Sequence, residues 1–149
     1  MSELNIKKAE EWFHELRNNL MQDIESIETS KFIITEWKHQ GEGGGKMSKI
    51  KGKVIEKGGV NISTVAGHFP KNFSKNIPGT QNSNSYKATG ISVVLHPLSP
   101  HIPSMHFNTR YLETEYQWFG GGIDITPCLS FDEENDYHLR LQKMCDLHD

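Results

Sequence analysis

The sequence predicts one α+β domain, in which a helix near each end of the chain flanks a run of strands. Apolar residues recur at helical spacing over residues 5–28, and short β-branched and aromatic segments follow between residues 31 and 126. A second, weaker helical pattern begins near Asp132. At 149 residues the chain is long enough for one hydrophobic core, so we expect residues 1–149 to form a single domain of α/β two-layer or sandwich type.

Composition argues against several classes of function. The net charge of −3 and the lack of a basic block give no general attraction to nucleic acid or to anionic membranes. No apolar run approaches the roughly 20 residues of a membrane span, and residues 1–10 lack the apolar run of a signal peptide. Cys128 and Cys145 are too few for a disulfide framework, which favours a reducing compartment, so we expect a cytoplasmic protein.

The first half of the chain is predicted to contain one helix and several strands. Residues 5–28 carry an apolar stripe typical of a helix that covers one face of a sheet, and residues 31–38 (KFIITEWK) indicate a strand. The glycine-rich segment 41–49 (GEGGGKMSK) fails the spacing of a phosphate-binding loop, and no helical pattern follows it, as a dinucleotide site would require. We interpret it as a flexible loop or hairpin tip.

Further strands are predicted around turns and a long loop. Residues 53–56 and 60–67 indicate two strands on either side of a turn at Gly58 and Gly59. Residues 68–84 have no periodicity, and we expect a mobile flap beside the functional site. Another strand is predicted over residues 117–126. Glycines 120–122 should interrupt it, because glycine weakens a strand and permits positive φ or close approach of a ligand.

Residues 91–96 and 105–112 predict a hairpin, because the prolines between them can continue neither strand. Side chains alternate between the two faces of a strand, so one surface of this hairpin should be polar and the other apolar. The polar surface would carry Ser92, His96, His106, Asn108 and Arg110. Both an ordinary solvated face and a functional face fit this pattern, although a solvated face is usually rich in Lys, Glu and Thr.

Asp124 lies between Ile123 and Ile125, and a carboxylate in an apolar setting is expected to be paired. It could form a salt bridge with Arg110, or it could accept a hydrogen bond from a ligand N–H group. The histidines offer a further possibility, since imidazole is a common metal ligand, although their spacings match no recognised ligand pattern. The candidate metal ligands are His96, His106 and His138.

Three segments of the chain resemble the oxygen-dependent coproporphyrinogen III oxidases of haem biosynthesis. They are residues 59–67 (GVNISTVAG), 88–111 (ATGISVVLHPLSPHIPSMHFNTRY) and 118–127 (WFGGGIDITP). The resemblance covers the N-terminal half of the family's length and implies a large antiparallel sheet flanked by helices, in a homodimer. Lys46 stands where the family has an arginine, which keeps the charge but loses the bidentate fork.

The resemblance implies a reaction and a set of roles. Two propionate side chains of coproporphyrinogen III would be oxidatively decarboxylated to vinyl groups, with O2 as the oxidant and protoporphyrinogen IX as the product. The catalytic residues would be His106 as proton donor, with Arg110 and Asp124 orienting the substrate. The substrate-binding residues would be Ser92, Asn108, Thr109 and Arg110.

The resemblance also bears on cofactors and partners. His96, His106 and His138 would be three of four proposed metal ligands, so a divalent metal is possible, and no organic cofactor is expected. The expected partners are coproporphyrinogen III, O2, and either a second copy of the chain or a complementary C-terminal half. The alternative is a truncated, non-catalytic remnant that at most binds tetrapyrrole.

Overall fold

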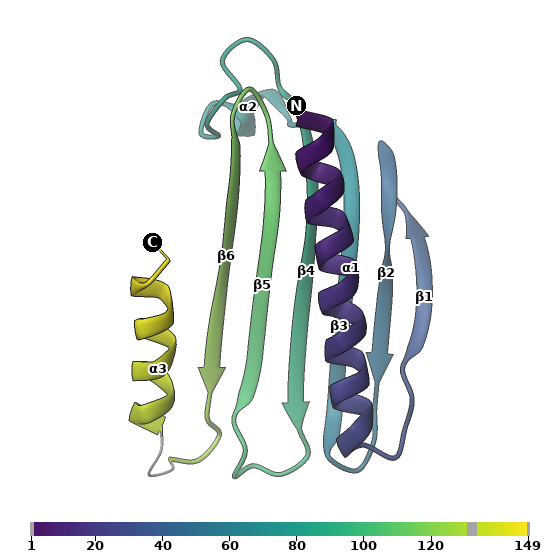
Figure 1. Cartoon of the computed structure of the whole chain (residues 1–149), viewed down its shortest axis with the longest axis vertical. Coiled ribbons are helices and arrows are strands. Elements are labelled where there is room, and N and C mark those ends of the chain that lie inside the picture. The colour runs from purple at the N-terminus through teal and green to yellow at the C-terminus, as the bar shows by residue number, and fades with distance from the viewer. Residues whose placement is uncertain (1, 131–133, 149) are drawn as a thin grey trace.

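The computed structural model describes residues 2–130 and 134–148, and its strands form a six-stranded antiparallel sheet (Figure 1). The strand order is β1-β2-β3-β4-β5-β6, so each strand pairs with its neighbours in sequence. The strands are β1 (Ile33–Lys38), β2 (Glu42–Ile50), β3 (Ile55–His68), β4 (Ser85–Pro97), β5 (Ser104–Glu113) and β6 (Gln117–Thr126). The helices are α1 (Ser2–Ile27), α2 (Lys71–Ser74) and α3 (Glu134–Asp146). The predicted α+β fold is confirmed.

Helix α1 lies across one face of the sheet, over β3, β4 and β5 (Figure 1). The hydrophobic core fills the space between them, with Phe13 1% exposed and Val60 of β3 fully buried. Ile91 and Val93 of β4 lie on the same side. Burying one such side chain stabilises the fold by roughly 1.5–3 kcal/mol, so the apolar stripe of α1 fixes which face of the sheet is covered. We call the opposite side of the sheet the far face.

A buried polar contact also joins α1 to the sheet. Arg17 is only 5% exposed, and its Nε and Nη2 atoms donate to Ser48 Oγ of β2 at 3.2 and 2.6 Å. Nη1 donates to Asn18 Oδ1 at 3.1 Å. Burial lowers the pKa of the Arg17 guanidinium from its usual value, yet an arginine stays charged at accessible pH. The buried positive charge of Arg17 is therefore stabilised by hydrogen bonds to hydroxyl and amide oxygens.

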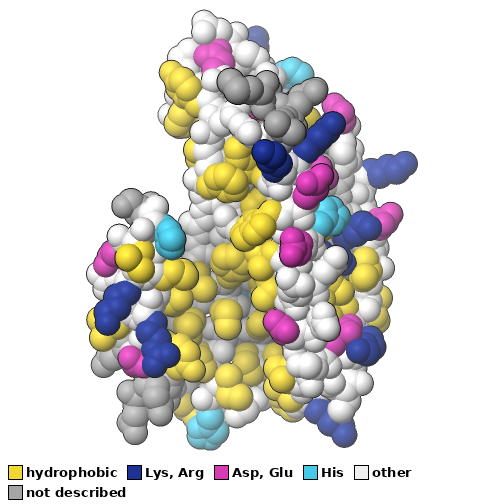
Figure 2. Space-filling view, in the orientation of Figure 1, with side chains coloured by type: hydrophobic (Ala, Val, Ile, Leu, Met, Phe, Trp, Pro, Cys, Tyr) yellow, Lys and Arg dark blue, Asp and Glu magenta, His cyan; other side chains and the backbone are white. Residues whose placement is uncertain are grey.

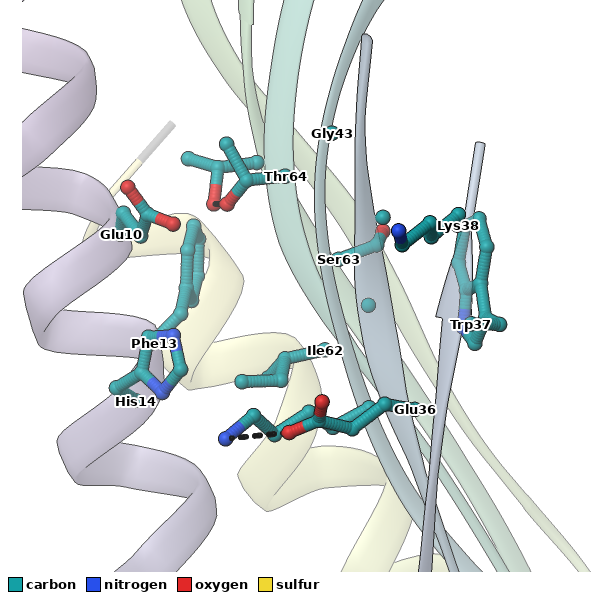
Figure 3. Close-up of a pocket in the computed structure, with 14 residues that line it drawn as sticks. Glu10, Phe13, His14, Glu36, Trp37, Lys38, Gly43, Ile62, Ser63 and Thr64 are labelled. Carbon is teal, nitrogen blue, oxygen red and sulfur yellow. Dashed lines mark hydrogen bonds and ion pairs between the residues drawn. The ribbon is translucent and has the colours of Figure 1, made fainter. Parts of the chain in front are cut away.

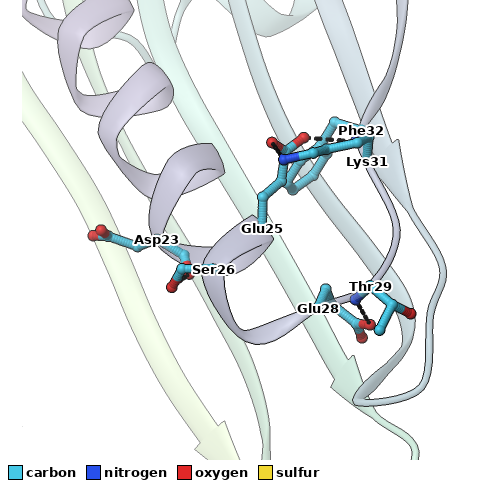
Figure 4. Close-up of polar contacts among 7 residues, drawn as sticks. All are labelled: Asp23, Glu25, Ser26, Glu28, Thr29, Lys31 and Phe32. Atoms are coloured by element: carbon cyan, nitrogen blue, oxygen red, sulfur yellow. Dashed lines mark hydrogen bonds and ion pairs between the residues drawn. The ribbon is translucent and has the colours of Figure 1, made fainter.

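The loop that leaves α1 is held by the carboxylate of Glu28. Figure 4 shows its hydrogen bond from the Thr29 N–H. The same carboxylate accepts hydrogen bonds from the backbone N–H groups of residues 53–55, in the turn between β2 and β3. These bonds, foremost the one from Ile55, hold the pKa of Glu28 below its usual range. Glu28 thus supplies acceptors for a turn that has few backbone partners of its own.

Two predicted elements were wrong. The glycine-rich segment 41–49 is not a loop, because β2 runs from Glu42 to Ile50 and pairs with β1 on one side and β3 on the other. Residues 58 and 59 do not form a turn either: they lie within β3, paired with β2 and with β4. Hydrogen bonds to a neighbouring strand on each side stabilise these segments as strands, despite the weak strand preference of glycine. The turn lies instead between Ile50 and Ile55.

The other elements follow the predictions more closely. Helix α1 begins at Ser2, a few residues earlier than expected, and β6 has the expected bounds but is continuous through its glycines. The long segment between β3 and β4 is a loop apart from the four residues of α2. The expected start of the last helix near Asp132 lies outside the described residues, and α3 begins at Glu134. None of the described helices is long and apolar enough to cross a membrane.

Candidate functional site

The register of β4, β5 and β6 brings the predicted polar residues together on the far face. Ser92 pairs with Asn108, and His106 pairs with Asp124. Arg110 pairs with Gly90 on one side and with Gly120 on the other. The buried residues Ile91, Val93 and Tyr111 occupy the alternate positions, which face α1. The expectation of one polar and one apolar surface on this hairpin is confirmed.

A cleft of about 550 Å³ opens over this part of the sheet. Ser92, Arg110 and Trp118 line it from the strands, and residues 76–78 line it from the loop between β3 and β4. That loop therefore lies beside the polar residues, as expected, and its mobility stays a prediction. Thr109 also borders the cleft, but it pairs with the buried Ile91, so its side chain takes the face of α1.

Beyond the cleft, two histidines and one carboxylate form a chain of hydrogen bonds. The Nε2 atoms of His96 and His106 are 2.8 Å apart, and His106 Nδ1 is 3.1 Å from Asp124 Oδ2. A carboxylate only accepts, so Nδ1 of His106 carries the proton towards Asp124. With His106 neutral, its Nε2 accepts from His96. A ligand that exchanges a proton with His106 Nε2 must therefore displace His96.

Thr126 is a member of this cluster that was not among the predicted residues. Its hydroxyl donates to Asp124 Oδ2 at 3.0 Å. The signal was present in the sequence, because Thr126 lies two positions after Asp124 and so shares its face of β6. Trp118, at the other end of β6, also shares this face, and it too was not among the predicted residues.

Arg110 and Asp124 do not form the salt bridge that we had considered. Asp124 contacts His106 and Thr126 instead, and its side chain is 57% exposed. Within the described part of the chain, Arg110 makes no side-chain hydrogen bond or ion pair, and it is exposed. The pairs Arg110–Gly120 and His106–Asp124 lie four residues apart along β5, which corresponds to about 13 Å. A free cation and an accessible carboxylate therefore lie on one face, separated by the length of a large ligand.

The third candidate metal ligand lies apart from the other two. His138 of α3 has its Nε2 3.3 Å from the carbonyl oxygen of Ile125. Over residues 2–130 and 134–148, no group of three or more His, Cys, Asp or Glu side chains is arranged to hold a metal ion. The described residues do not fit a metal, and we derive no chemical step through one.

A separate cleft of about 530 Å³ lies on the face of α1, between that helix and β1 and β2 (Figure 3). Glu10 and His14 of α1 line it, together with Glu36 of β1 and Lys46 of β2. The last two form an ion pair at 3.2 Å, drawn as the dashed line in Figure 3. This cleft holds none of the predicted catalytic or substrate-binding residues, so we place the candidate site on the far face.

The far face has the chemistry expected of a class of protein that binds a large ligand against an open antiparallel sheet. Arg110 offers a planar fork for a carboxylate. Asp124 can accept from N–H groups, and the imidazole rings of His96 and His106 can each donate and accept hydrogen bonds. The matching ligand carries both acidic side chains and N–H donors.

The comparisons identify the family. The chain belongs to the coproporphyrinogen III oxidase family, whose model matches residues 8–149. A protein of Rickettsia akari (strain Hartford) named oxygen-dependent coproporphyrinogen-III oxidase is 46% identical over 158 residues, covering 97% of this chain and 56% of the relative. Proteins of the same name from Rickettsia bellii (strain RML369-C) and Rickettsia prowazekii (strain Madrid E) are 44% and 45% identical, and the chain covers 57% of each. The chain spans little more than half the length of these curated relatives.

Proposed function

We propose that this chain supplies the substrate-binding face of an oxygen-dependent coproporphyrinogen III oxidase. The proposal rests on two side chains that share the far face of the sheet: Arg110, which has no partner among the described residues, and Asp124, which is accessible. In the reaction each propionate arm, –CH2–CH2–COOH, reacts with O2 to give a vinyl group, CO2 and H2O2. The substrate supplies the electrons and O2 accepts them, so the proposal includes no organic cofactor.

The far-face residues take distinct roles in this proposal. Arg110 binds a propionate carboxylate through its guanidinium fork, and Asp124 accepts hydrogen bonds from pyrrole N–H groups. His106 manages the proton, held in orientation by Asp124. Ser92 and Asn108 offer further polar contacts, since neither side chain has a hydrogen-bond partner among the described residues. The protein then contributes mainly orientation, because the electron-rich tetrapyrrole can react with O2 itself.

Catalysis is proposed to need a complementary C-terminal half. Figure 2 shows a hollow lined with hydrophobic side chains between α1 and α3. Phe119 of β6 and Met105 of β5 face that side and are 62% and 37% exposed. In addition, among the strands that the structure describes, β6 pairs with β5 alone and leaves its other edge without a strand partner. A further part of the enzyme that covers this surface would remove an apolar patch and a strand edge that otherwise favour aggregation.

An activity assay tests this function. The purified chain is mixed with coproporphyrinogen III and O2, with and without the C-terminal segment of the Rickettsia akari relative that the chain does not cover, and vinyl products are separated by chromatography. We expect product only with the added segment. Arg110→Lys keeps the charge but loses the fork, so it should lower product formation about tenfold or more, while Arg140→Lys on exposed α3 should not. Absence of product in every mixture would refute the oxidase function.

The second candidate is a non-catalytic chain that binds tetrapyrrole, which is supported by the exposed Arg110 and Asp124 side chains on the far face. Fluorescence quenching by coproporphyrin III without turnover in any mixture would support it. The homodimer and the cytoplasmic location implied by the family belong to the proposal as well. Sedimentation of the purified protein and fractionation of the source cells test these two points.

A further inference from the structure

The three consecutive glycines of β6 are not equivalent. A Cβ atom added at Gly121 would collide with the backbone carbonyl oxygen of Asn108 on β5. A Cβ atom added at Gly120 or Gly122 would meet no heavy atom within 4 Å. Close packing against β5 therefore explains glycine at 121, and it explains neither of its neighbours.

Backbone conformation does not explain the other two glycines either. Among the described residues, only Gly43 and Gly79 are glycines with positive φ. Residues 120 and 122 thus have backbone angles that alanine can adopt. Glycine weakens a strand, and replacing it by alanine at a compatible position usually stabilises a protein. The described fold gives no stability reason for glycine at either place.

Both glycines lie within the candidate site. Gly120 pairs with Arg110, and Gly122 pairs with Asn108, so both occupy the far face. Along β6 they fill the two far-face positions between Trp118 and Asp124. The result is an area of uncovered backbone bordered by the guanidinium of Arg110 at one end and the carboxylate of Asp124 at the other.

Uncovered backbone is needed here because the side chain of Asp124 is short. The aspartate side chain extends only a small distance above the sheet, so a bulky ring reaches its oxygens only if the ring lies close to the strand. A methyl group at position 122, two residues from Asp124, would hold the ring away from the carboxylate. At position 120 it would intrude beside Arg110 in the same way.

We propose that Gly120 and Gly122 are specificity-determining positions, at which a pyrrole-bearing face of the tetrapyrrole lies directly against the backbone of β6. Direct contact lets the pyrrole N–H groups donate to Asp124 while a propionate reaches Arg110. Ligands whose rings carry bulky groups on that face would be rejected. This inference deepens the proposed function and rests on it.

Binding and stability are measured together on a set of single substitutions. The probe is coproporphyrin III, a stable oxidised form of the substrate class, titrated against the intrinsic fluorescence of the whole chain. We expect Gly120→Ala and Gly122→Ala to keep or raise the melting temperature and to weaken binding about tenfold or more. Gly121→Ala should lower the melting temperature, because its methyl group would collide with β5. Lys87→Ala is the control: this exposed side chain lies on the α1 side of β4 and lines a different cleft, so affinity should not change.

Arg110→Ala separates this inference from the function on which it rests. If the unmodified chain binds the probe and Arg110→Ala weakens binding, while Gly120→Ala and Gly122→Ala bind as tightly as the unmodified chain, the inference is refuted and the proposed function stands. If the unmodified chain does not bind the probe, both are refuted. If Gly122→Ala destabilises the protein as much as Gly121→Ala, the glycine serves folding and the inference fails.

Discussion

The contact between Arg17 and Ser48 makes the sharpest test of how α1 is joined to the sheet. Ser48→Ala removes the acceptor of two hydrogen bonds from a buried cation, which should lower the free energy of unfolding by about 2 kcal/mol. Arg17→Met keeps most of the side-chain volume but leaves the buried Ser48 hydroxyl without its partner, at a cost of about 2 kcal/mol. The double variant leaves neither group unpaired, so it should cost only about 1 kcal/mol.

The expected coupling free energy is therefore about 3 kcal/mol, at the upper end of what contacting pairs show. It is measured by urea denaturation of the four proteins at one pH, followed by circular dichroism, with equal m-values as the check on two-state unfolding. If the two single effects simply add in the double variant, the two side chains do not stabilise the fold as a pair. A double variant as stable as the unmodified chain would mean that the polar pair serves a purpose other than stability.

Three further predictions follow from the same structure. Glu28→Gln should lower the urea midpoint of unfolding at neutral pH. Because folding lowers the pKa of Glu28, its carboxylate contributes stability above the unfolded pKa of about 4.3, and this contribution is lost as pH falls through the folded pKa. The urea midpoints of the variant and of the unmodified chain should therefore converge in acid. A constant difference down to low pH would contradict this. Phe13→Ala should lower the free energy of unfolding by about 3–5 kcal/mol in the same measurement, and a loss below about 1 kcal/mol would show that α1 does not hold the core together. Gly43→Ala should lower the melting temperature, because residue 43 has φ of 88° and an added Cβ would collide with Thr64, whereas an unchanged melting temperature would contradict the register of β2.

The elements that the sequence predicted well are those with local causes. The apolar stripe of α1 and the alternation in residues 91–96 and 105–112 are set by the periods of the helix and the strand, so each can be read within a few residues. The composition of the far face followed from that alternation once the hairpin was placed. The position of Arg110, Asn108 and Ser92 on one face could therefore be predicted without tertiary information.

The parts that the sequence did not predict depend on pairing between distant residues. The glycines of β2 form a strand because β1 and β3 supply hydrogen bonds on both flanks, and a local reading sees only their weak preference for strands. The contact between His106 and Asp124 depends on the register of β5 against β6, which fixes one residue opposite the other. Whether Asp124 would meet Arg110 or His106 could not be decided without that register.

On the proposed function, the two faces of the sheet would have different tasks, the far face in substrate binding and the α1 side in assembly with a complementary half. The exposed apolar side chains Met105 and Phe119 lie on the side of α1, whereas Arg110, Asn108 and Asp124 lie on the far face. A complementary half that fills the hollow between α1 and α3 would leave the far face open to substrate. Its effect on the site would instead pass through β6, where His138 of α3 already contacts the carbonyl of Ile125 next to Asp124. If the proposed function holds, tetrapyrrole binding would need only the far face, and assembly would change the position of Asp124 and thereby turnover. Binding that appears before assembly and turnover that appears after it are the two observations that this separation requires.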